Sequence, residues 1–361
     1  MLKKAAALFL VGAGLATWVG CGSTSSRYLY ASIPVSNEIV AFREDPNSGV
    51  LTQLVGSPIT AGQAVQALAV HPSKKYLYAA NSGEDTVSLF TISSSGVLQE
   101  QLPRTSTGTG PNLLAIDAAG AYLYVANSGS FDLSVFSISA SNGALTLVQI
   151  PGGNPVPLGM SPINMALSSA GILYITGSSS NGVSSNGLIE TFTVSQSQGI
   201  PTFTALYLTG TNPYGLAITP AGGFLYTANN VDDSLSEFTI ASGGALTPLT
   251  SSPIGETYSG PVALQIDPSG SYMYVADEGS GNLAAFSIGS DGGLTLLASS
   301  PFTTAAQPAT IGMDPSGKYL FVGNQKSPAI QSFSVDTSDG ALTSVSSYGV
   351  PYTPTSIVVT Q

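Results

Sequence analysis

A segment built around two aromatic residues recurs seven times along the chain, at intervals of 46 to 52 residues. Most copies run close to Tyr-Leu-Tyr-Val-Ala-Asn, and they begin at Tyr28, Tyr76, Tyr122, Ile172, Phe224, Tyr272 and Tyr319. A period of about 20 to 50 residues is typical of proteins assembled from one repeated supersecondary unit. Tyrosine, valine and phenylalanine at this density favour β-strands over helices. The chain is therefore predicted to be an array of seven β-units.

Each unit contains four strand-like segments in the same order, which we call strands a, b, c and d. In the third unit they are Pro111–Ile116, Tyr122–Asn127, Leu133–Ile138 and Asn142–Thr146. Turns such as Asp267–Gly270 separate strand a from strand b, and glycine turns lead into strand d. No segment after residue 20 shows a sustained apolar period of 3.6 residues, so helix should be almost absent.

Four antiparallel strands in a unit of about 48 residues are the signature of a β-propeller blade. The first unit begins at its strand b, at Tyr28, whereas the chain ends with Pro354–Val359, which reads as a strand a. We therefore predict an all-β, seven-bladed propeller over residues 28–361, closed by pairing of the C-terminal strand with the N-terminal blade. An open β-solenoid is the alternative, but it would need capping units at its ends.

The repeated pattern Pro-x-x-apolar, Asp-Pro-Ser-Gly, Tyr-Leu-Tyr-Val-Ala-Asn and Gly-x-Leu-Thr resembles that of the seven-bladed lactonase family. That family includes 6-phosphogluconolactonases and muconate-cycloisomerase-like proteins, and the pattern is also similar to YVTN-type repeats of bacterial surface propellers. The resemblance covers about residues 28–361 and rests on strand and turn residues, so it implies the fold rather than an activity. Lactonase-like enzymes place His, Arg and Glu near the channel, whereas the single histidine here, His71, falls in an a–b turn. No catalytic residue is carried over.

The N-terminal segment has the pattern of an export signal. Two lysines precede the apolar run Ala5–Leu15, and a small residue stands before the single cysteine, Cys21. This order resembles a bacterial lipoprotein signal, although Trp18 stands where such signals usually carry leucine. We expect residues 1–20 to be removed as a signal peptide, and residues 21–27 to form a tether lipidated at Cys21. An ordinary secretory signal with an incidental cysteine is the alternative. Either signal predicts export to the bacterial cell envelope, in the periplasm or on the cell surface.

Composition and charge restrict the possible partners. The chain has a net charge of −11 and only 8% charged residues, which argues against a nucleic-acid partner. One cysteine and one histidine exclude a disulfide framework, a cysteine-based zinc site and a paired-histidine metal motif. We expect no cofactor and no metal. The d–a and b–c loops, which form one face of a propeller, are mostly acidic, with Lys326 as their clear base. This face, which we call the upper face, disfavours a phosphosugar because phosphate prefers arginine, lysine or a helix N-terminus.

Two sets of polar residues recur near the predicted channel. The first ends strand b in the regular units, as Asn81, Asn127, Asn229, Asp277 and Asn324. It forms either a polar ring that binds a cation or side-chain hydrogen bonds to the backbone, and its recurrence in every regular unit favours the second interpretation. The second set lies at the start of strands a, nearest the axis, as Asn112, Asn164, Asn212 and Tyr214. We take this second set as candidate ligand-binding residues.

Two long irregular stretches, Pro151–Pro162 and Gly177–Gly187, interrupt the repeat in the same unit. Insertions of this kind map to loops on one face, so both are expected side by side on the upper face. The second stretch adds Asn181 and Asn186 to the candidate ligand-binding residues. Neither stretch carries a charge, which suits a neutral polar ligand.

The sequence thus favours a lipid-anchored propeller that acts as a surface binding or scaffold module. A lactonase-type hydrolase that opens an uncharged sugar lactone is the main alternative, and a metal-dependent hydrolase with oxygen ligands is a third. The expected partners are a neutral carbohydrate, a lactone or a cell-envelope protein, together with a membrane reached through the lipid. The protein is expected to be a monomer.

Overall fold

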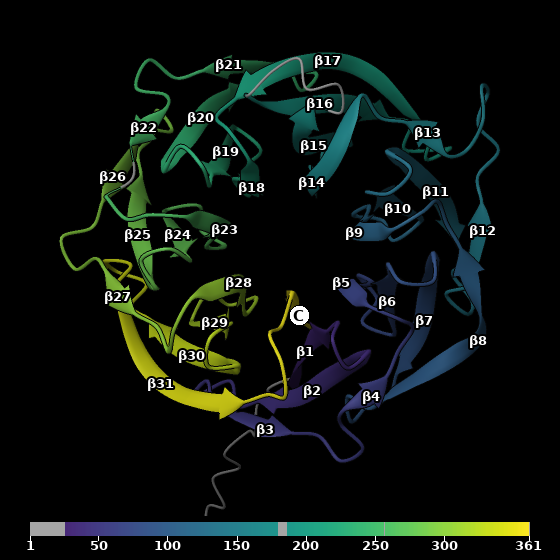
Figure 1. Ribbon diagram of the computed structural model, residues 1–361, viewed down its shortest axis with the longest axis horizontal. Helices are drawn as coiled ribbons and strands as arrows, with labels where there is room; N and C mark the ends of the chain where they lie inside the picture. Colours follow the sequence, from purple (N-terminus) through teal and green to yellow (C-terminus); the bar gives the residue numbers. More distant parts are fainter. Residues whose placement is uncertain (1–25, 180–185, 256, 361) are drawn as a thin grey trace, which may run out of the picture.

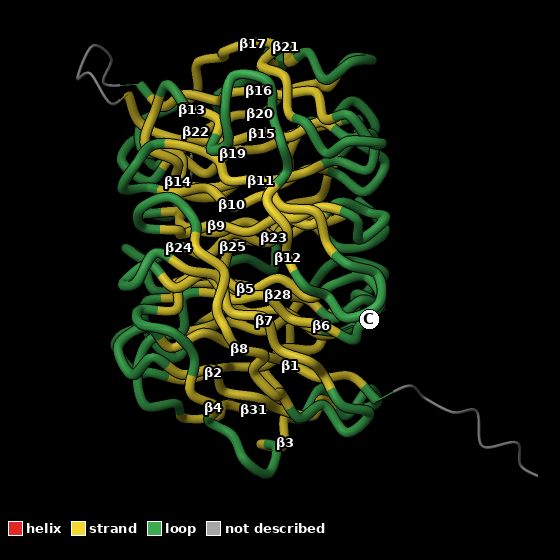
Figure 2. The backbone as a smooth tube through the Cα atoms, turned by 90° about the vertical axis from the view of Figure 1, so that its right-hand side faces the viewer, coloured by secondary structure: helices red, strands yellow, loops and turns green. Residues whose placement is uncertain are grey.

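The computed structural model describes residues 26–179, 186–255 and 257–360, and these form a seven-bladed β-propeller around a central channel (Figure 1). Every strand pairing in these residues is antiparallel, and they contain no helix. Viewed edge-on, the strands lie in the middle of the disc and the loops gather on its two faces (Figure 2). The prediction of an all-β propeller of seven four-stranded blades is confirmed.

Blade 1 contains both ends of the described chain: β1 (Arg27–Ile33), β2 (Glu38–Glu44), β3 (Leu51–Gln53), β4 (Ile59–Thr60) and β32 (Ser356–Val359). Blade 2 contains β5 (Val65–Val70), β6 (Tyr76–Asn81), β7 (Thr86–Ile92) and β8 (Leu98–Ser106). Blade 3 contains β9 (Pro111–Ile116), β10 (Tyr122–Asn127), β11 (Asp132–Ile138), β12 (Leu145–Leu147) and β13 (Val156–Pro157). Blade 4 contains β14 (Met160–Leu167), β15 (Ile172–Ser179), β16 (Gly187–Val194) and β17 (Pro201–Thr209).

Blade 5 contains β18 (Pro213–Ile218), β19 (Phe224–Asn229), β20 (Ser234–Ile240), β21 (Leu246–Pro248) and β22 (Ile254–Gly255). Blade 6 contains β23 (Pro261–Ile266), β24 (Tyr272–Asp277), β25 (Asn282–Ile288), β26 (Leu294–Leu296) and β27 (Phe302–Thr303). Blade 7 contains β28 (Pro308–Met313), β29 (Tyr319–Asn324), β30 (Ala329–Val335) and β31 (Leu342–Gly349). Strand d is continuous in blades 2, 4 and 7 and is split into two pieces in the other four, both pieces pairing with strand c.

The second aromatic residue of each anchor segment links neighbouring blades. Six of these residues are fully buried tyrosines, and each hydroxyl donates a hydrogen bond of 2.7–3.1 Å to a glycine carbonyl in the c–d turn of the next blade. The pairs are Tyr30–Gly96, Tyr78–Gly143, Tyr124–Gly199, Tyr174–Gly244, Tyr226–Gly292 and Tyr274–Gly340. Only glycine fits at these turns, because Gly96 has a positive φ of 81° and a Cβ there would overlap the Tyr28 ring.

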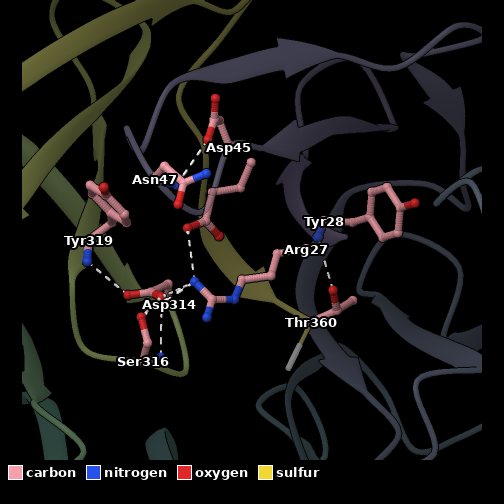
Figure 3. Close-up of polar contacts among 9 residues, drawn as sticks. Arg27, Tyr28, Asp45, Asn47, Asp314, Ser316, Tyr319 and Thr360 are labelled. Carbon is pink, nitrogen blue, oxygen red and sulfur yellow. Dashed lines mark hydrogen bonds and ion pairs between the residues drawn. The ribbon is translucent and has the colours of Figure 1, made fainter. Parts of the chain in front are cut away.

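The ring closes as predicted, by pairing of β32 with β1. The pairing extends past the strand, because the Tyr28 and Thr360 main chains are joined by a further hydrogen bond of 2.8 Å. The seam between blades 7 and 1 differs from the other six, since Phe321 occupies the position of the buried tyrosine and has no hydroxyl. Arg27, Glu44 and Asp314 meet at this seam instead (Figure 3).

Candidate functional site

The upper mouth of the central channel is the candidate site. Strands a stand innermost in each blade (Figure 1). Each follows a d–a loop, so its first residues lie at the upper face. They enclose a cavity of about 270 Å³. Its polar lining residues are Gln66, Asn112, Asn164, Thr310, Thr355 and Ser356. The rest of its lining is leucine, isoleucine, methionine and alanine, so no side chain that lines this cavity carries a charge. The lower part of the channel is lined mainly by alanine, leucine and isoleucine.

Asn112 and Asn164, two of the candidate residues, both line this mouth. Each carboxamide bridges to the next blade: Asn112 Nδ2 donates to the Pro162 carbonyl (3.1 Å), and Asn164 Nδ2 donates to the Tyr214 carbonyl (2.6 Å). Asn164 Oδ1 accepts the Met165 amide, whereas Asn112 Oδ1 is buried and has no hydrogen-bond partner among the residues described. Asn112 therefore lines the channel, while its unpartnered oxygen is itself covered by protein.

The other candidate residues do not line this cavity. Asn212 adopts a left-handed conformation (φ 59°), and its carbonyl accepts the amides of Tyr214 and Asn230, so it shapes the turn into β18. Tyr214 is 44% exposed. It takes part in the channel mouth only through its backbone carbonyl, which accepts a hydrogen bond from Asn164 Nδ2. Asn186 is exposed on the upper face, at the start of β16. Asn181 and Cys21 lie outside the described residues.

Gln66 was not among the sequence candidates, yet it lines the channel beside Thr355. Its carbonyl accepts hydroxyl hydrogen bonds from Ser32 (3.1 Å) and Thr355 (2.8 Å). The strand register could have identified Gln66. Val65 and Pro111 each pair with the last residue of strand b in their own blade, so Gln66 holds in blade 2 the position that Asn112 holds in blade 3. Thr355 could not be placed by the repeat, because it belongs to the strand that returns to blade 1.

The recurrent residues that end strand b have a structural role. All five are fully buried. Asn81 Nδ2 donates to the hydroxyls of Thr86 (3.1 Å) and Ser88 (2.9 Å), and Asn229 Nδ2 donates to Ser234 and Ser236 at similar distances. Most of the partners are thus hydroxyls of strand c rather than the backbone groups that the sequence suggested. These bonds join strand b to strand c in blades 2, 3 and 5, whereas Asn324 Nδ2 donates to the Val322 carbonyl of its own strand. None of the five residues lines the channel cavity.

Several upper-face carboxylates join blades. Asp85 Oδ1 accepts the Gly110 amide at 2.7 Å, and Asp233 Oδ1 accepts the Gly260 amide at 2.7 Å. Both aspartates have positive φ, which aims them from a b–c loop at the next d–a loop. Arg104, on β8, pairs with Glu84 at 3.0 Å and is a second base near this face, so Lys326 is not the only one.

His71 lies on the opposite face, which is formed by the a–b and c–d turns and which we call the lower face. The Ser73 amide donates to its Nδ1 (3.0 Å), so its Nε2 carries the proton and donates to the Gly120 carbonyl (2.8 Å). The ring is 8% exposed. His71 thus joins blades 2 and 3, far from the upper channel mouth.

The described ends of the two long stretches lie side by side in blade 4, because Met160–Pro162 pairs directly with Gly177–Ser179. Residues 180–185 of the second stretch lie outside the described residues. The expectation that both stretches are irregular was wrong in part, since the paired residues extend β14 and β15 beyond the length of strands a and b in other blades. Glu190 supports this extension: its Oε1 accepts the Gly159 amide at 2.7 Å, and burial raises the pKa of its carboxyl group. The extended ladder forms a rim beside the Asn112 and Asn164 amides.

Among residues 26–179, 186–255 and 257–360, no cluster of three His, Cys, Asp or Glu side chains is arranged to hold a metal ion. The same residues include no helix with the length and apolar character needed to cross a membrane.

Solved structures of several bacterial proteins share this architecture. The chain aligns with a protein from Lactobacillus plantarum at a TM-score of 0.76 and 22% identity, covering 93% of this chain and 99% of the other. It aligns with a proposed 6-phosphogluconolactonase from Bacteroides fragilis at 0.76 and 20% identity, covering 94% and 99%. It aligns with a periplasmic gluconolactonase from Pseudomonas aeruginosa at 0.74 and 19% identity, covering 93% and 99%. Identities this low establish the common fold and no more.

A search of curated protein sequences found no match. The sequence model that describes the seven-bladed β-propeller lactonases matches residues 23–160, 157–305 and 263–359, which together span nearly all of the propeller. The chain therefore belongs to the lactonase family of seven-bladed β-propellers.

Proposed function

We propose that the protein is an exported binding module that holds a neutral, polyhydroxylated ligand at the upper mouth of its channel. The observation that carries this proposal is the uncharged lining of the mouth, where amides and hydroxyls stand on an apolar floor. Amide and hydroxyl groups both donate and accept hydrogen bonds, which matches the hydroxyl groups of a sugar or a sugar lactone. An apolar pocket with a few placed polar groups is the usual form of a small-molecule site.

The same lining favours binding over catalysis. Lactone hydrolysis needs a group that activates water, such as a carboxylate, a histidine or a metal-bound hydroxide. The residues that line the cavity include neither a carboxylate nor a histidine. A phosphosugar is disfavoured because phosphate binding would call for arginine or lysine at the mouth.

Binding of D-glucono-1,5-lactone and of neutral monosaccharides, followed by calorimetry, tests this function. Asn112→Ala removes a carboxamide that lines the mouth and is expected to weaken binding about tenfold. Gln99→Ala, which removes an exposed amide on the outer strand β8, is the matched control and should bind normally. Equal binding by the Asn112→Ala variant and the wild type would place the ligand elsewhere.

Lactone hydrolysis is the second candidate, and the family membership of the chain favours it. The assay is the opening of D-glucono-1,5-lactone at constant pH, measured against the spontaneous rate. Saturable turnover that is lost in Asn112→Ala would assign hydrolysis to the channel mouth. Saturable binding without any turnover would rule out hydrolysis and support the binding function.

We also propose that Cys21 carries a lipid that holds the propeller at a bacterial membrane. The order of residues in the N-terminal segment supports this, and so does the place where the described chain begins. Arg27 starts β1 on the lower face, which also bears the exposed side chains of Arg43, Lys74, Lys75 and Lys318. Each base near anionic lipid contributes about 1 kcal/mol, but the exposed carboxylates of Asp45, Asp291, Asp336 and Asp339 on the same face offset this attraction. The orientation therefore follows from the tether, which leaves from the lower face, so that this face would lie against the membrane and the channel mouth would face away.

Membrane fractionation of Cys21→Ser tests the anchor. The variant should be found in the soluble fraction, whereas the wild type stays with the membrane. A variant that remains membrane-bound would show that the attachment does not depend on a lipid at Cys21.

A further inference from the structure

We propose a second ligand site on the lower face, in a pocket between blades 3 and 4 that fits a neutral, hydroxylated molecule the size of a monosaccharide. The pocket has a volume of about 320 Å³. Its lining includes Asp117, Tyr122, Tyr124, Leu167, Ser168 and Gln196. It lies on the opposite face from the channel mouth, shares no lining residue with it, and does not depend on the function proposed above.

The a–b turns of blades 6 and 7 show what normally occupies this place. Both turns read Asp-Pro-Ser-Gly. The proline ring of Pro268 packs against the turn glycine of the next blade, Gly317, where an added Cβ would lie 2.8 Å from the ring. The serine closes the turn, since Ser269 Oγ donates to Asp267 Oδ2 at 2.5 Å. Proline thus fills the seam between blades, and serine satisfies the second carboxylate oxygen.

Blade 3 lacks both residues, because its turn reads Asp117-Ala118-Ala119-Gly120. With alanine in place of proline, the seam toward blade 4 stays open. The atoms nearest to a Cβ built at the facing glycine, Gly171, belong to Val194 and Gln196 of blade 4 itself. Two substitutions in one turn therefore create the pocket and change its chemistry together.

The second substitution leaves a hydrogen-bond acceptor in the pocket wall. Asp117 Oδ1 accepts the amides of Ala121 (2.7 Å) and Tyr122 (2.6 Å), as its counterpart does in blade 6. Asp117 Oδ2 has no donor within hydrogen-bond distance among the residues that the structure describes. The carboxylate is thus fixed in position by one oxygen and free to bind a ligand with the other.

Donors stand opposite this acceptor. Ser168 Oγ accepts the Ile172 amide at 3.0 Å, so its own proton remains available. Gln196 adds a carboxamide, and Leu167 and Tyr122 supply apolar surface. A sugar ring has hydroxyls that donate and accept as well as an apolar C–H face, and it uses all of these groups. An anion would be repelled by Asp117, and a simple amine would leave the donors unused.

Ligand-detected NMR with D-glucose, D-galactose, D-mannose and N-acetyl-D-glucosamine tests the site in the purified full-length protein. The double variant Ala118→Pro/Ala119→Ser restores the turn of blades 6 and 7, fills the seam and satisfies Asp117 Oδ2. It is expected to bind the sugar at least about tenfold more weakly and to melt no lower than the wild type. Ala221→Ser makes the same alanine-to-serine change in the turn of blade 5 and should bind like the wild type.

Three outcomes would overturn the proposal. They are equal sugar binding by the double variant and the wild type, no binding of any of the four sugars, and binding of an amine such as spermidine in place of the sugars. Asn112→Ala separates the two sites. Sugar binding that survives in Asn112→Ala and is lost in the double variant belongs to the lower face, whereas the reverse result assigns it to the channel and overturns the lower-face site.

Discussion

Arg27 and Asp314 form an ion pair across the seam where the first and last blades meet, with 2.6 Å between Nη1 and Oδ2 (Figure 3). The Asp314 side chain is fully buried, and Arg27 is only 18% exposed. Glu44, also fully buried, lies 3.6 Å from the same guanidinium nitrogen. One guanidinium therefore serves two buried carboxylates at the seam that lacks the tyrosine hydroxyl of the other six.

Removing the guanidinium should open this seam. Arg27→Ala would leave Asp314 and Glu44 buried beside each other without a counter-charge, and breaking a buried pair in this way costs about 3–5 kcal/mol. We expect a large loss in the free energy of unfolding, measured by urea denaturation. Arg43→Ala removes an exposed arginine from the neighbouring strand β2 and serves as the control. A loss of similar size in both variants would mean that the ion pair does not hold the seam.

Glu44 makes stability depend on pH. Burial and the nearby Asp314 raise the pKa of its carboxyl group from 4.5 to about 7, although Arg27 opposes them. The folded state therefore holds the proton more tightly than the unfolded state. The stabilisation from this group is complete below pH 4.5 and is lost as the pH rises to about 7. The loss amounts to about 3 kcal/mol.

Glu44→Gln should abolish that loss. The variant is expected to match the wild type at about pH 4.5 and to exceed its unfolding free energy at about pH 8. Urea denaturation at both values measures the difference. Glu190→Gln is the comparison variant. Burial also raises the pKa of the Glu190 carboxyl group, but Glu190 lies in blade 4, away from the seam between blades 7 and 1. If the unfolding free energies of the wild type and of Glu44→Gln differ by the same amount at both pH values, Glu44 does not titrate in this range.

The repeat in the sequence was sufficient to predict the blades, because its period and strand order repeat the same pairing in each unit. The incomplete units at the two ends predicted the closure of the ring for the same reason. The ion pair could not be predicted. Asp314 occupies the same turn position as Asp117 and Asp267, and only the closure of the ring brings Arg27, 287 residues away in the sequence, to it.

The candidate site was only partly predictable. Asn112 directly follows the proline that begins β9, and Asn164 lies two residues after Pro162 within β14. The innermost place of these strands puts both residues at the channel. The same reasoning was wrong for Asn212 and Tyr214, which do not line the cavity. Asn212 stands before β18, at the left-handed position that Ala64 and Gln307 hold in other blades. Tyr214 holds the register position of Asn112, but it is 44% exposed and is not part of the lining. Both positions recur in other blades, so the repeat alone does not show which side chains line the cavity.

The six hydroxyl bonds between blades can be tested in both directions. Tyr124→Phe leaves the Gly199 carbonyl without its donor and should lower the unfolding free energy by about 1 kcal/mol. Phe321→Tyr should raise it by a similar amount, since Gly49 faces the Tyr319 ring as Gly96 faces Tyr28 and offers a carbonyl at the equivalent place. Thermal denaturation measures both. A destabilised Phe321→Tyr variant would show that the seventh seam cannot hold the hydroxyl.

Deletion of residues 354–361 should open the ring. It removes β32, which pairs with β1 and buries Ile357, and it removes Thr360 Oγ1, which accepts the Tyr28 amide at 2.9 Å. The freed edge of β1 would then present unpaired amides and carbonyls, which favour association between chains. We expect a lower melting temperature and larger species in size-exclusion chromatography.

Deletion of Gln361 alone is the control. A synthetic peptide of residues 354–361 should restore the elution volume of the full chain by adding its strand to β1. Truncated protein that melts and elutes like the full chain would show that the closure lies elsewhere.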